Sequence, residues 1–215
     1  MKFWFRLAVL SSCVIGAWAQ PASPKAEAVP KQSALDAVLF YQILLGELNT
    51  RQGSPGSGFS MILDAARKTR DPALFQRAVD MALQARSGEA ALQAAQTWKK
   101  EIPSAIEASR YVLQILLALN RVEEAGKALT VSIHELPLED QAGAIASVPR
   151  LFGVVQDKAL ASSVVEKALT QSLTKPQTVA SAWTTIGRMR RDAGQITSAV
   201  EASVKGHAAD PKAQG

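Results

Sequence analysis

Histidines, serines and paired acidic residues are the side chains of this 215-residue chain that could act in catalysis. Its two histidines, His134 and His207, are not spaced as a metal-binding pair, and no thiol accompanies them. Both lie near the ends of expected helices, where a cation suits the helix dipole. No serine lies in a Gly-x-Ser-x-Gly nucleophile motif. We therefore expect no catalytic residue, no metal site and no cofactor.

The acidic pairs and a glycine-rich stretch also have structural explanations. Glu123-Glu124 and Glu139-Asp140 lie at the starts of expected helices, where the dipole favours negative charge over a general acid/base role. The stretch 53–58, Gly-Ser-Pro-Gly-Ser-Gly, lacks the Gly-Lys-Ser/Thr ending of a phosphate-binding loop, and no strand precedes it. We interpret it as a flexible turn between two helices.

Basic residues do not indicate a nucleic-acid-binding protein. Without the first 19 residues the chain has 22 basic and 19 acidic side chains, a net charge of 22 − 19 = +3. Arg188, Arg190 and Arg191 would point in different directions on a helix. We expect a protein or extended peptide as the partner, and no nucleic acid.

A spacing of about 34 residues organises the chain. Pro103 and Pro137 are 34 residues apart, and an alanine, Ala91 or Ala125, precedes each by twelve residues. Ala199 precedes Pro211 by the same distance. This period is typical of a helix-turn-helix repeat and resembles the tetratricopeptide repeat.

The copy from Trp183 to Pro211 fits that repeat best. Trp183, Ile186 and Gly187 fall on one helical stripe, at the W-x2-L-G spacing of the repeat. We expect Trp183 in the core. Gly187 and Ala199 are small, so a second helix over 196–209 can lie close to the first. Gly194 should end the first helix.

The predicted fold is all-α, a tetratricopeptide-like right-handed superhelical solenoid of antiparallel helix pairs. The composition agrees, with 47% apolar but only 6% aromatic residues. Ser104 and Glu107 form the clearest helix-capping box. Pro149 should kink or split the first helix of the fourth pair. The expected helix hairpins cover residues 34–70, 72–102, 104–136, 138–174, which is irregular, and 177–209, and a tail follows at 212–215.

The amino-terminal residues predict export. Lys2 and Arg6 precede an apolar run that is too short for a permanent membrane helix, and Ala19 ends a signal-peptidase site. Residues 1–19 are then a signal peptide and 20–33 a disordered linker. Cys13 also fits a bacterial lipobox, in which it would be lipidated. We favour cleavage after Ala19, and expect membrane attachment only if Cys13 is lipidated.

A groove along the first helices is the expected partner-binding surface. In this repeat class these helices line the concave face, and the stripe opposite the packing residues is exposed there. Arginines in it could hold a carboxylate by two hydrogen bonds. An ordinary solvated helix face explains each residue equally well. The predicted groove residues are Gln76, Asp80, Arg110, Gln114, Ser181, Thr184, Arg188 and Arg191.

The region 35–135 resembles a known group of proteins. The segments Leu44-Leu45-Gly46-Glu47-Leu48, 65–72 (Ala-Ala-Arg-Lys-Thr-Arg-Asp-Pro) and 91–98 (Ala-Leu-Gln-Ala-Ala-Gln-Thr-Trp) are similar to the amino-terminal repeats of proteobacterial periplasmic tetratricopeptide proteins. That group includes outer-membrane lipoproteins that bind a carboxyl-terminal-processing protease and present cell-wall hydrolases to it. The resemblance implies a periplasmic or outer-membrane adaptor with such a protease, or its substrates, as partner.

The main functional hypothesis is therefore an exported, non-enzymatic scaffold that mediates protein–protein interaction in the bacterial cell envelope. The alternative is a structural assembly factor. The chain stops just after Pro211, so the face of the helix over 196–209 would be uncapped and could mediate self-association. The chain could equally be a truncated relative of a longer repeat protein. An enzyme is the least favoured reading.

Overall fold

A computed structural model of the chain describes residues 37–211, which form ten α-helices and one 3-10 helix. The predicted signal peptide, its cleavage site at Ala19, Cys13, the linker over 20–33 and the tail over 212–215 lie outside the described residues. The helices are α1 (Ala37–Arg51), α2 (Pro55–Thr69), α3 (Pro72–Gln84), α4 (Gly88–Glu101), α5 (Ile106–Ala118), α6 (Val122–His134), α7 (Leu138–Phe152), α8 (Lys158–Ala168), η1 (Thr170–Thr174), α9 (Val179–Asp192) and α10 (Ile196–Ala209).

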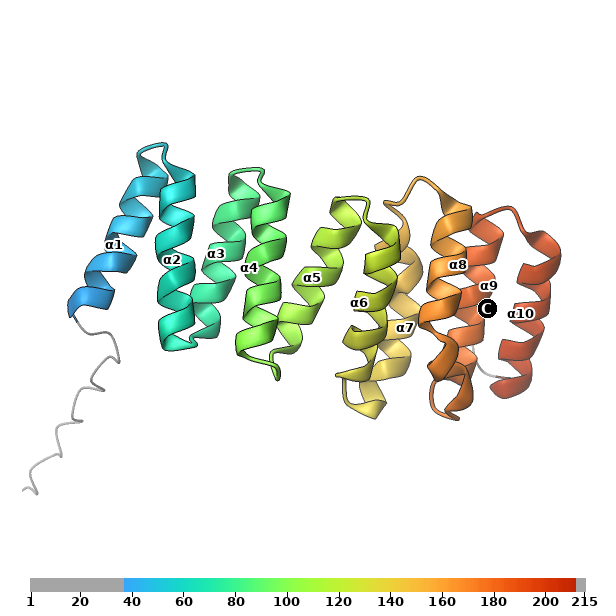
Figure 1. Cartoon of the computed structure of the whole chain (residues 1–215). Coiled ribbons are helices and arrows are strands. Elements are labelled where there is room, and N and C mark those ends of the chain that lie inside the picture. Colours follow the sequence, from blue (N-terminus) through green and yellow to red (C-terminus); the bar gives the residue numbers. More distant parts are fainter. Residues whose placement is uncertain (1–36, 212–215) are drawn as a thin grey trace, which may run out of the picture. The chain divides into compact units, whose positions relative to one another are not determined.

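Successive helices run up and down beside one another and pack in series (Figure 1). From α1 to α6 each helix packs on the next, and α9 packs on α10 in the same way. An apolar core with Ile62, Phe75, Leu116 and Ile186 continues through the stack. The prediction of an all-α, tetratricopeptide-like stack of antiparallel helix pairs is confirmed for the described residues.

In each regular pair, the two helices cross at two small or buried residues that are twelve positions apart in the sequence. These residue pairs are Gly46 and Gly58, Val79 and Ala91, Leu113 and Ala125, and Gly187 and Ala199, and all eight are buried. A methyl group on Gly187 would lie 3.0 Å from the Ser203 hydroxyl. A side chain at residue 187 would therefore crowd α10, and glycine there allows the two helices to approach closely.

The glycine-rich stretch 53–58 is not the long flexible turn that we expected. Only Gly53 has a positive φ, of 87°, and α2 already begins at Pro55. Gly58 lies inside α2, where an added Cβ would overlap the Thr50 side chain and lie 2.5 Å from the Gly46 carbonyl oxygen. The glycine at position 58 thus serves close helix packing instead of chain flexibility.

Pro149 does not split α7, contrary to one form of the prediction. A proline has no N–H to donate to the carbonyl four residues earlier, which is that of Ile145. The buried Thr185 hydroxyl of α9 donates a hydrogen bond of 3.0 Å to this carbonyl oxygen. The hydrogen bond that the proline removes is therefore replaced from a neighbouring helix, and α7 continues to Phe152.

The fourth pair departs from the regular arrangement in another way. α7 packs mainly on α9, and α8 packs on α6 and α9, so that α7 and α8 do not form a closely packed hairpin. α8 ends at Ala168, and η1 follows it. Asp157 caps α8 by accepting a hydrogen bond of 2.9 Å from the Leu160 N–H. The hairpin expected over 138–174 is thus irregular.

The caps of α3 and α5 differ. Asp71 caps α3 by accepting a hydrogen bond of 2.8 Å from the Ala73 N–H, and Pro72 follows in the first turn. The Ser104–Glu107 capping box does not form, because the N-cap residue of α5 is Ala105. The helix starts one residue later than the motif requires.

An ion pair joins the first two helix pairs. Arg77 of α3 donates two hydrogen bonds of 2.6 Å to the two carboxylate oxygens of Glu47 on α1. These hydrogen bonds lower the pKa of Glu47 below its ordinary value of 4.5. The bidentate geometry fixes the register of α3 on α1.

Trp98 is a fully buried core residue, whereas Trp183 packs against the core and is only partly buried. Trp98 of α4 is 2% exposed, and its ring lies 6.3 Å from that of Phe75 and 5.9 Å from that of Tyr111, measured between centroids. Trp183 is only partly buried, and the Lys205 ammonium lies 4.5 Å from its ring centroid. The expectation that Trp183 is a core residue is thus wrong in degree, since one face of its ring is covered by a lysine.

We predict that Trp98→Ala destabilises the protein by about 3–5 kcal/mol, as large-to-small core substitutions do. Trp183→Ala should cost less, because Trp183 is already partly hydrated. Urea unfolding of the two variants, followed by circular dichroism, measures both changes. An equal or larger cost for Trp183→Ala would contradict this assignment of the core.

The Thr185 hydroxyl is predicted to stabilise the fold more strongly when residue 149 is proline than when it is alanine. Thr185→Val should cost about 1–3 kcal/mol, because it leaves the buried Ile145 carbonyl without a donor. In a Pro149→Ala background the restored backbone N–H at position 149 can bond that carbonyl, and the same change should cost clearly less. A double-mutant cycle by chemical denaturation measures the coupling; additive effects would show that the hydroxyl does not replace the missing N–H.

Candidate protein-binding groove

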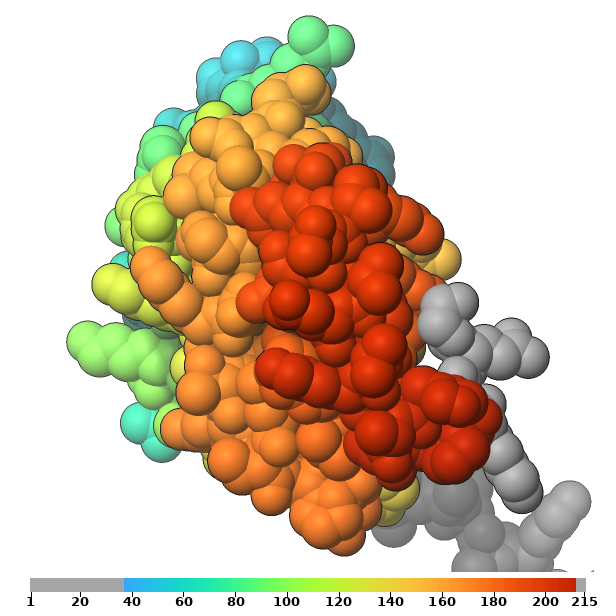
Figure 2. All heavy atoms as spheres, turned by 90° about the vertical axis from the view of Figure 1, so that its right-hand side faces the viewer, coloured from blue at the N-terminus to red at the C-terminus, as the bar shows by residue number. Residues whose placement is uncertain are grey.

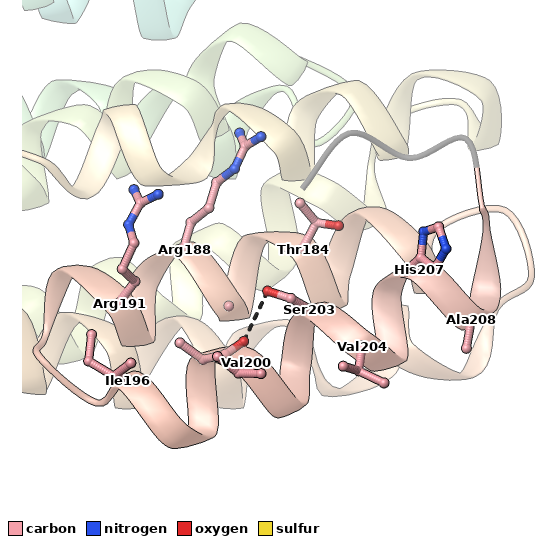
Figure 3. A pocket seen from close by; sticks show the side chains of 11 residues that line it. Thr184, Arg188, Arg191, Ile196, Val200, Ser203, Val204, His207 and Ala208 are labelled. Atoms are coloured by element: carbon pink, nitrogen blue, oxygen red, sulfur yellow. Dashed lines mark hydrogen bonds between the residues drawn. The ribbon is translucent and has the colours of Figure 1, made fainter.

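A groove of about 710 Å³ lies between α9 and α10. Figure 2 looks at the face of the described residues where α10 lies at the surface, and Figure 3 shows the groove from close by. α9 contributes a mostly polar wall, and α10 contributes a mostly apolar one. The lining residues are Thr184, Gly187, Arg188 and Arg191 of α9, and Ile196, Ala199, Val200, Ser203, Val204, His207 and Ala208 of α10.

The apolar wall is a stripe along α10. Ile196, Val200 and Val204 follow one another at intervals of four residues, so they lie above one another on one helical face (Figure 3). Their exposed fractions are 60%, 58% and 63%. Another side of the same helix, with Ala199, Ala202 and Gly206, is buried. α10 is therefore apolar both toward its neighbours and toward the groove.

The polar groups of the groove differ in how they are bound. Ser203 donates its hydroxyl hydrogen to the Ala199 carbonyl, 3.0 Å away within the same helix (Figure 3). Arg188 and Arg191 extend from α9, and Arg191 pairs with Asp192 at 3.0 Å. His207 lies in the last turn of α10, as expected. The groove thus combines an apolar wall with cationic guanidinium groups along its other side.

The third arginine of this region faces elsewhere. Arg190 donates hydrogen bonds to both carboxylate oxygens of Glu166 on α8, at 3.3 and 2.7 Å, and a third to the Ser198 carbonyl. Its guanidinium is therefore bound between α8 and α10 and takes no part in the groove. This agrees with the expectation that the three arginines do not form one patch.

The eight predicted groove residues do not line one cavity. Thr184, Arg188 and Arg191 line the groove between α9 and α10, whereas Ser181 lies partly buried on α9 outside its lining. The remaining four are Gln76 and Asp80 on α3, and Arg110 and Gln114 on α5. Their part in binding a partner stays a prediction.

Contacts between α3 and α5 involve one of these residues. The Gln76 side-chain amide donates a hydrogen bond of 3.2 Å to the Tyr111 hydroxyl. Arg110 and Gln114 are exposed, as predicted. Leu117, which follows Gln114 on the same helical stripe, is buried. The exposed stripe of α5 is thus shorter than the helical period alone suggests.

Sequence reasoning missed the apolar stripe of α10. Its signal was available, because Ile196, Val200 and Val204 recur every four residues beside the buried Ala199 and Ala202. Two adjacent apolar faces on one short helix indicate two packing surfaces.

Two of the groups with catalytic potential are bound by neighbouring side chains. The His134 Nε2 atom lies 2.5 Å from the Gln171 side-chain oxygen. Glu124 accepts two hydrogen bonds of 2.7 Å from Arg121, and this ion pair lowers the pKa of its carboxyl. Within residues 37–211, no three His, Cys, Asp or Glu side chains gather as metal ligands.

In the part of the chain that the structure covers, none of the helices combines the length and the apolar character that a bilayer span requires.

Comparisons with known proteins give only distant likenesses. No protein-family model matches the chain, and no curated protein matches its sequence. Among solved structures, MamA 41-end from Desulfovibrio magneticus RS-1 is 15% identical, with 85% of this chain and all of that chain covered and a TM-score of 0.45. The MamA RS-1 ArsTM double mutant is 17% identical, with 83% and 97% covered and a TM-score of 0.45.

A third similar structure is TTC0263, a thermophilic TPR protein in Thermus thermophilus. It is 14% identical, with 81% of this chain and 92% of that chain covered and a TM-score of 0.38. At such TM-scores the description of the fold rests on the repeat spacing and the helix packing of this chain itself.

Proposed function

We propose that the protein is an exported, non-enzymatic scaffold that binds a helical segment of a protein partner in the groove between α9 and α10. The observation that carries this proposal is the stripe of Ile196, Val200 and Val204, which is apolar, about 60% exposed and beside the arginines of α9. Apolar residues at four-residue intervals are complementary to an amphipathic helix laid in a groove. Covering them removes apolar surface from water, which drives association.

The chemistry of the groove indicates the kind of segment that fits it. An apolar face would pack on α10, while Arg188 and Arg191 favour a neighbouring carboxylate on the other side. Cationic groups that flank an apolar wall help to fix the orientation of a bound segment. The proposed ligand is thus an amphipathic helix whose apolar face covers the α10 stripe.

We place this scaffold in the bacterial cell envelope. The support is the sequence of residues 1–19, which has the features of a signal peptide that ends at Ala19. Cleavage there gives a periplasmic protein, and lipidation at Cys13 would give an outer-membrane lipoprotein. A carboxyl-terminal-processing protease, or a substrate presented to it, is the partner that the resemblance of residues 35–135 suggests.

A second candidate function is structural assembly through self-association. It is favoured by a second exposed apolar surface, on α1, which includes Tyr41 and Leu44. Copies of a chain with two such surfaces could bind one another. A groove that stays free in such an assembly could still bind a different protein.

Site-specific photo-cross-linking in the producing cell tests the scaffold. A photoreactive amino acid at Val200 should give discrete cross-linked protein bands, because this side chain lies in the proposed binding surface. The matched control is the same probe at Glu201, the next residue of α10, which is exposed but outside the groove lining. Val204→Asp should abolish the bands obtained with the Val200 probe.

Two results would contradict the proposal. Equal bands from Val200 and Glu201 would mean nonspecific contact, and no bands from Val200 would mean that the groove has no protein ligand in the cell. Loss of a band on deletion of the processing protease would identify that protease, or a complex containing it, as the partner. Persistence of every band would exclude it.

A further inference from the structure

We propose that the helix which fills the α9/α10 groove is α1 of a second copy of this chain, so that copies join head to tail. This inference rests on the groove of the proposed function and names its occupant. The contact would repeat, between two molecules, the packing that already joins successive helix pairs inside one molecule.

α1 carries an apolar surface that nothing covers among the described residues. Leu39 and Gly46 face α2 and are buried, whereas Tyr41, Leu44 and Leu48 are 60%, 43% and 40% exposed. These three residues recur at intervals of three and four, so they form one stripe along the helix. A stripe of this kind is what a helix offers when it packs on a neighbour.

The residues at the equivalent positions of α3 show how such a stripe packs on a neighbouring helix pair. Each place is defined by its distance from the crossing residue, which is Gly46 in α1 and Val79 in α3. The three places are five residues before, two residues before and two residues after the crossing residue. They are occupied by Tyr41, Leu44 and Leu48 in α1, and by Leu74, Arg77 and Met81 in α3. Arg77 bonds Glu47, Met81 is buried and Leu74 is partly buried, because α3 packs on the preceding pair.

α5 and α9 use the same places in the same way. In α5 the ring of Tyr111 lies 5.9 Å from that of Trp98 on the preceding helix, between centroids. In α9 the Thr185 hydroxyl bonds the Ile145 carbonyl of α7. The other residues at these places, all buried, are Ala108 and Ile115 in α5, and Ala182 and Met189 in α9. In α1 alone, of these four helices, the three places are all exposed.

α10 carries the opposite half of this interface. Thirteen residues after the crossing residue stand Phe59 in α2, Leu92 in α4 and Val200 in α10. Leu92 is buried and Phe59 partly buried in pairs that another helix follows, whereas Val200 is 58% exposed. The α9/α10 groove is therefore the surface on which the first helix of a following pair packs.

The two halves also match in length and polarity. α1 has 15 residues and α10 has 14, so one helix can cover the other from end to end. The stripe of α1 contains no charged residue, and the one acidic side chain of α1, Glu47, is held by Arg77 and lies beside the stripe. The α1 stripe itself would thus bring no charge onto the apolar wall of α10.

A contact of this kind is heterologous, because the surfaces on the two copies differ. Such contacts leave one free surface at each end of an assembly, and copies add in a chain unless the geometry closes a ring. Molecular mass should therefore rise with protein concentration, without a fixed stop at the dimer.

Two blocking variants test the proposal on the full chain, purified after export with its own leader. Leu44→Asp blocks the α1 stripe, and Val200→Asp blocks the groove. Size-exclusion chromatography with light scattering should show oligomers for the unmodified protein and monomers for each variant alone. A 1:1 mixture of the variants should give a dimer of twice the monomer mass and nothing larger, because each partner retains one working surface. Glu201→Gln, outside the groove, should behave as the unmodified protein.

Each other outcome overturns the proposal. A monomer at all concentrations for the unmodified protein excludes the contact. An oligomer that Val200→Asp abolishes and Leu44→Asp leaves intact would mean that the groove does not bind α1. Tyr41→Asp repeats the test on the same stripe, and thermal melts of all variants show that they are folded. If the protein is monomeric while the Val200 probe still captures another protein in cells, the groove binds a foreign helix and only this inference fails.

Discussion

The close crossing of two helices at small or buried residues twelve positions apart is the constraint on which the rest of this structure depends. It brings Gly187 against Ala199 and Gly46 against Gly58, with no room for a side chain at Gly58. Each closely packed helix pair has an apolar surface on both of its outer sides. Stacking is then the only arrangement that buries both.

Stacking explains where apolar side chains are buried and where they are not. Inside the stack, Phe75, Trp98 and Leu116 are covered by successive helices. On α1 and α10 the same kind of surface is exposed. The candidate functional site is therefore a surface of the repeat stack that has no neighbouring helix among the described residues.

The irregular fourth pair shows how the stack tolerates a defect. Pro149 should disturb α7, yet the Thr185 hydroxyl bonds the carbonyl that the proline leaves without a donor. α8 meanwhile packs on α6 and α9 in place of α7. The packing neighbours of α7 and α8 thus differ from their neighbours in the sequence, while apolar residues of both helices, such as Ile145 and Val164, stay buried.

The sequence predicted the repeat because it depends on spacing, and spacing is visible in a single chain. Ala91, Ala125 and Ala199 are buried as the period required. The sequence could not show that Trp98 is more buried than Trp183, because the burial of a ring depends on which helix packs against it. Ser104 failed as a cap because the start of α5 was displaced by one residue. Gly58 was misread as a turn residue, since glycine serves flexibility and close packing equally well.

Half of the groove was predictable and half was not. Thr184, Arg188 and Arg191 were identified from their place on the exposed stripe of α9. The helical period does not show which other helix lines the same groove as this stripe. The apolar wall of α10 was overlooked because exposed valines look like core residues in a sequence. Only the packing of α10 on α9 shows which of its two apolar faces remains open.

The most direct test of the crossing constraint compares one substitution at two helical glycines. Alanine favours a helix over glycine by about 1 kcal/mol. At Gly143 of α7, where an added Cβ meets nothing within 4 Å, alanine should raise the free energy of unfolding. At Gly58, where it would meet the Gly46 carbonyl oxygen at 2.5 Å, alanine should lower it. Urea unfolding of the two variants should therefore give changes of opposite sign, and stabilisation by both would contradict the account.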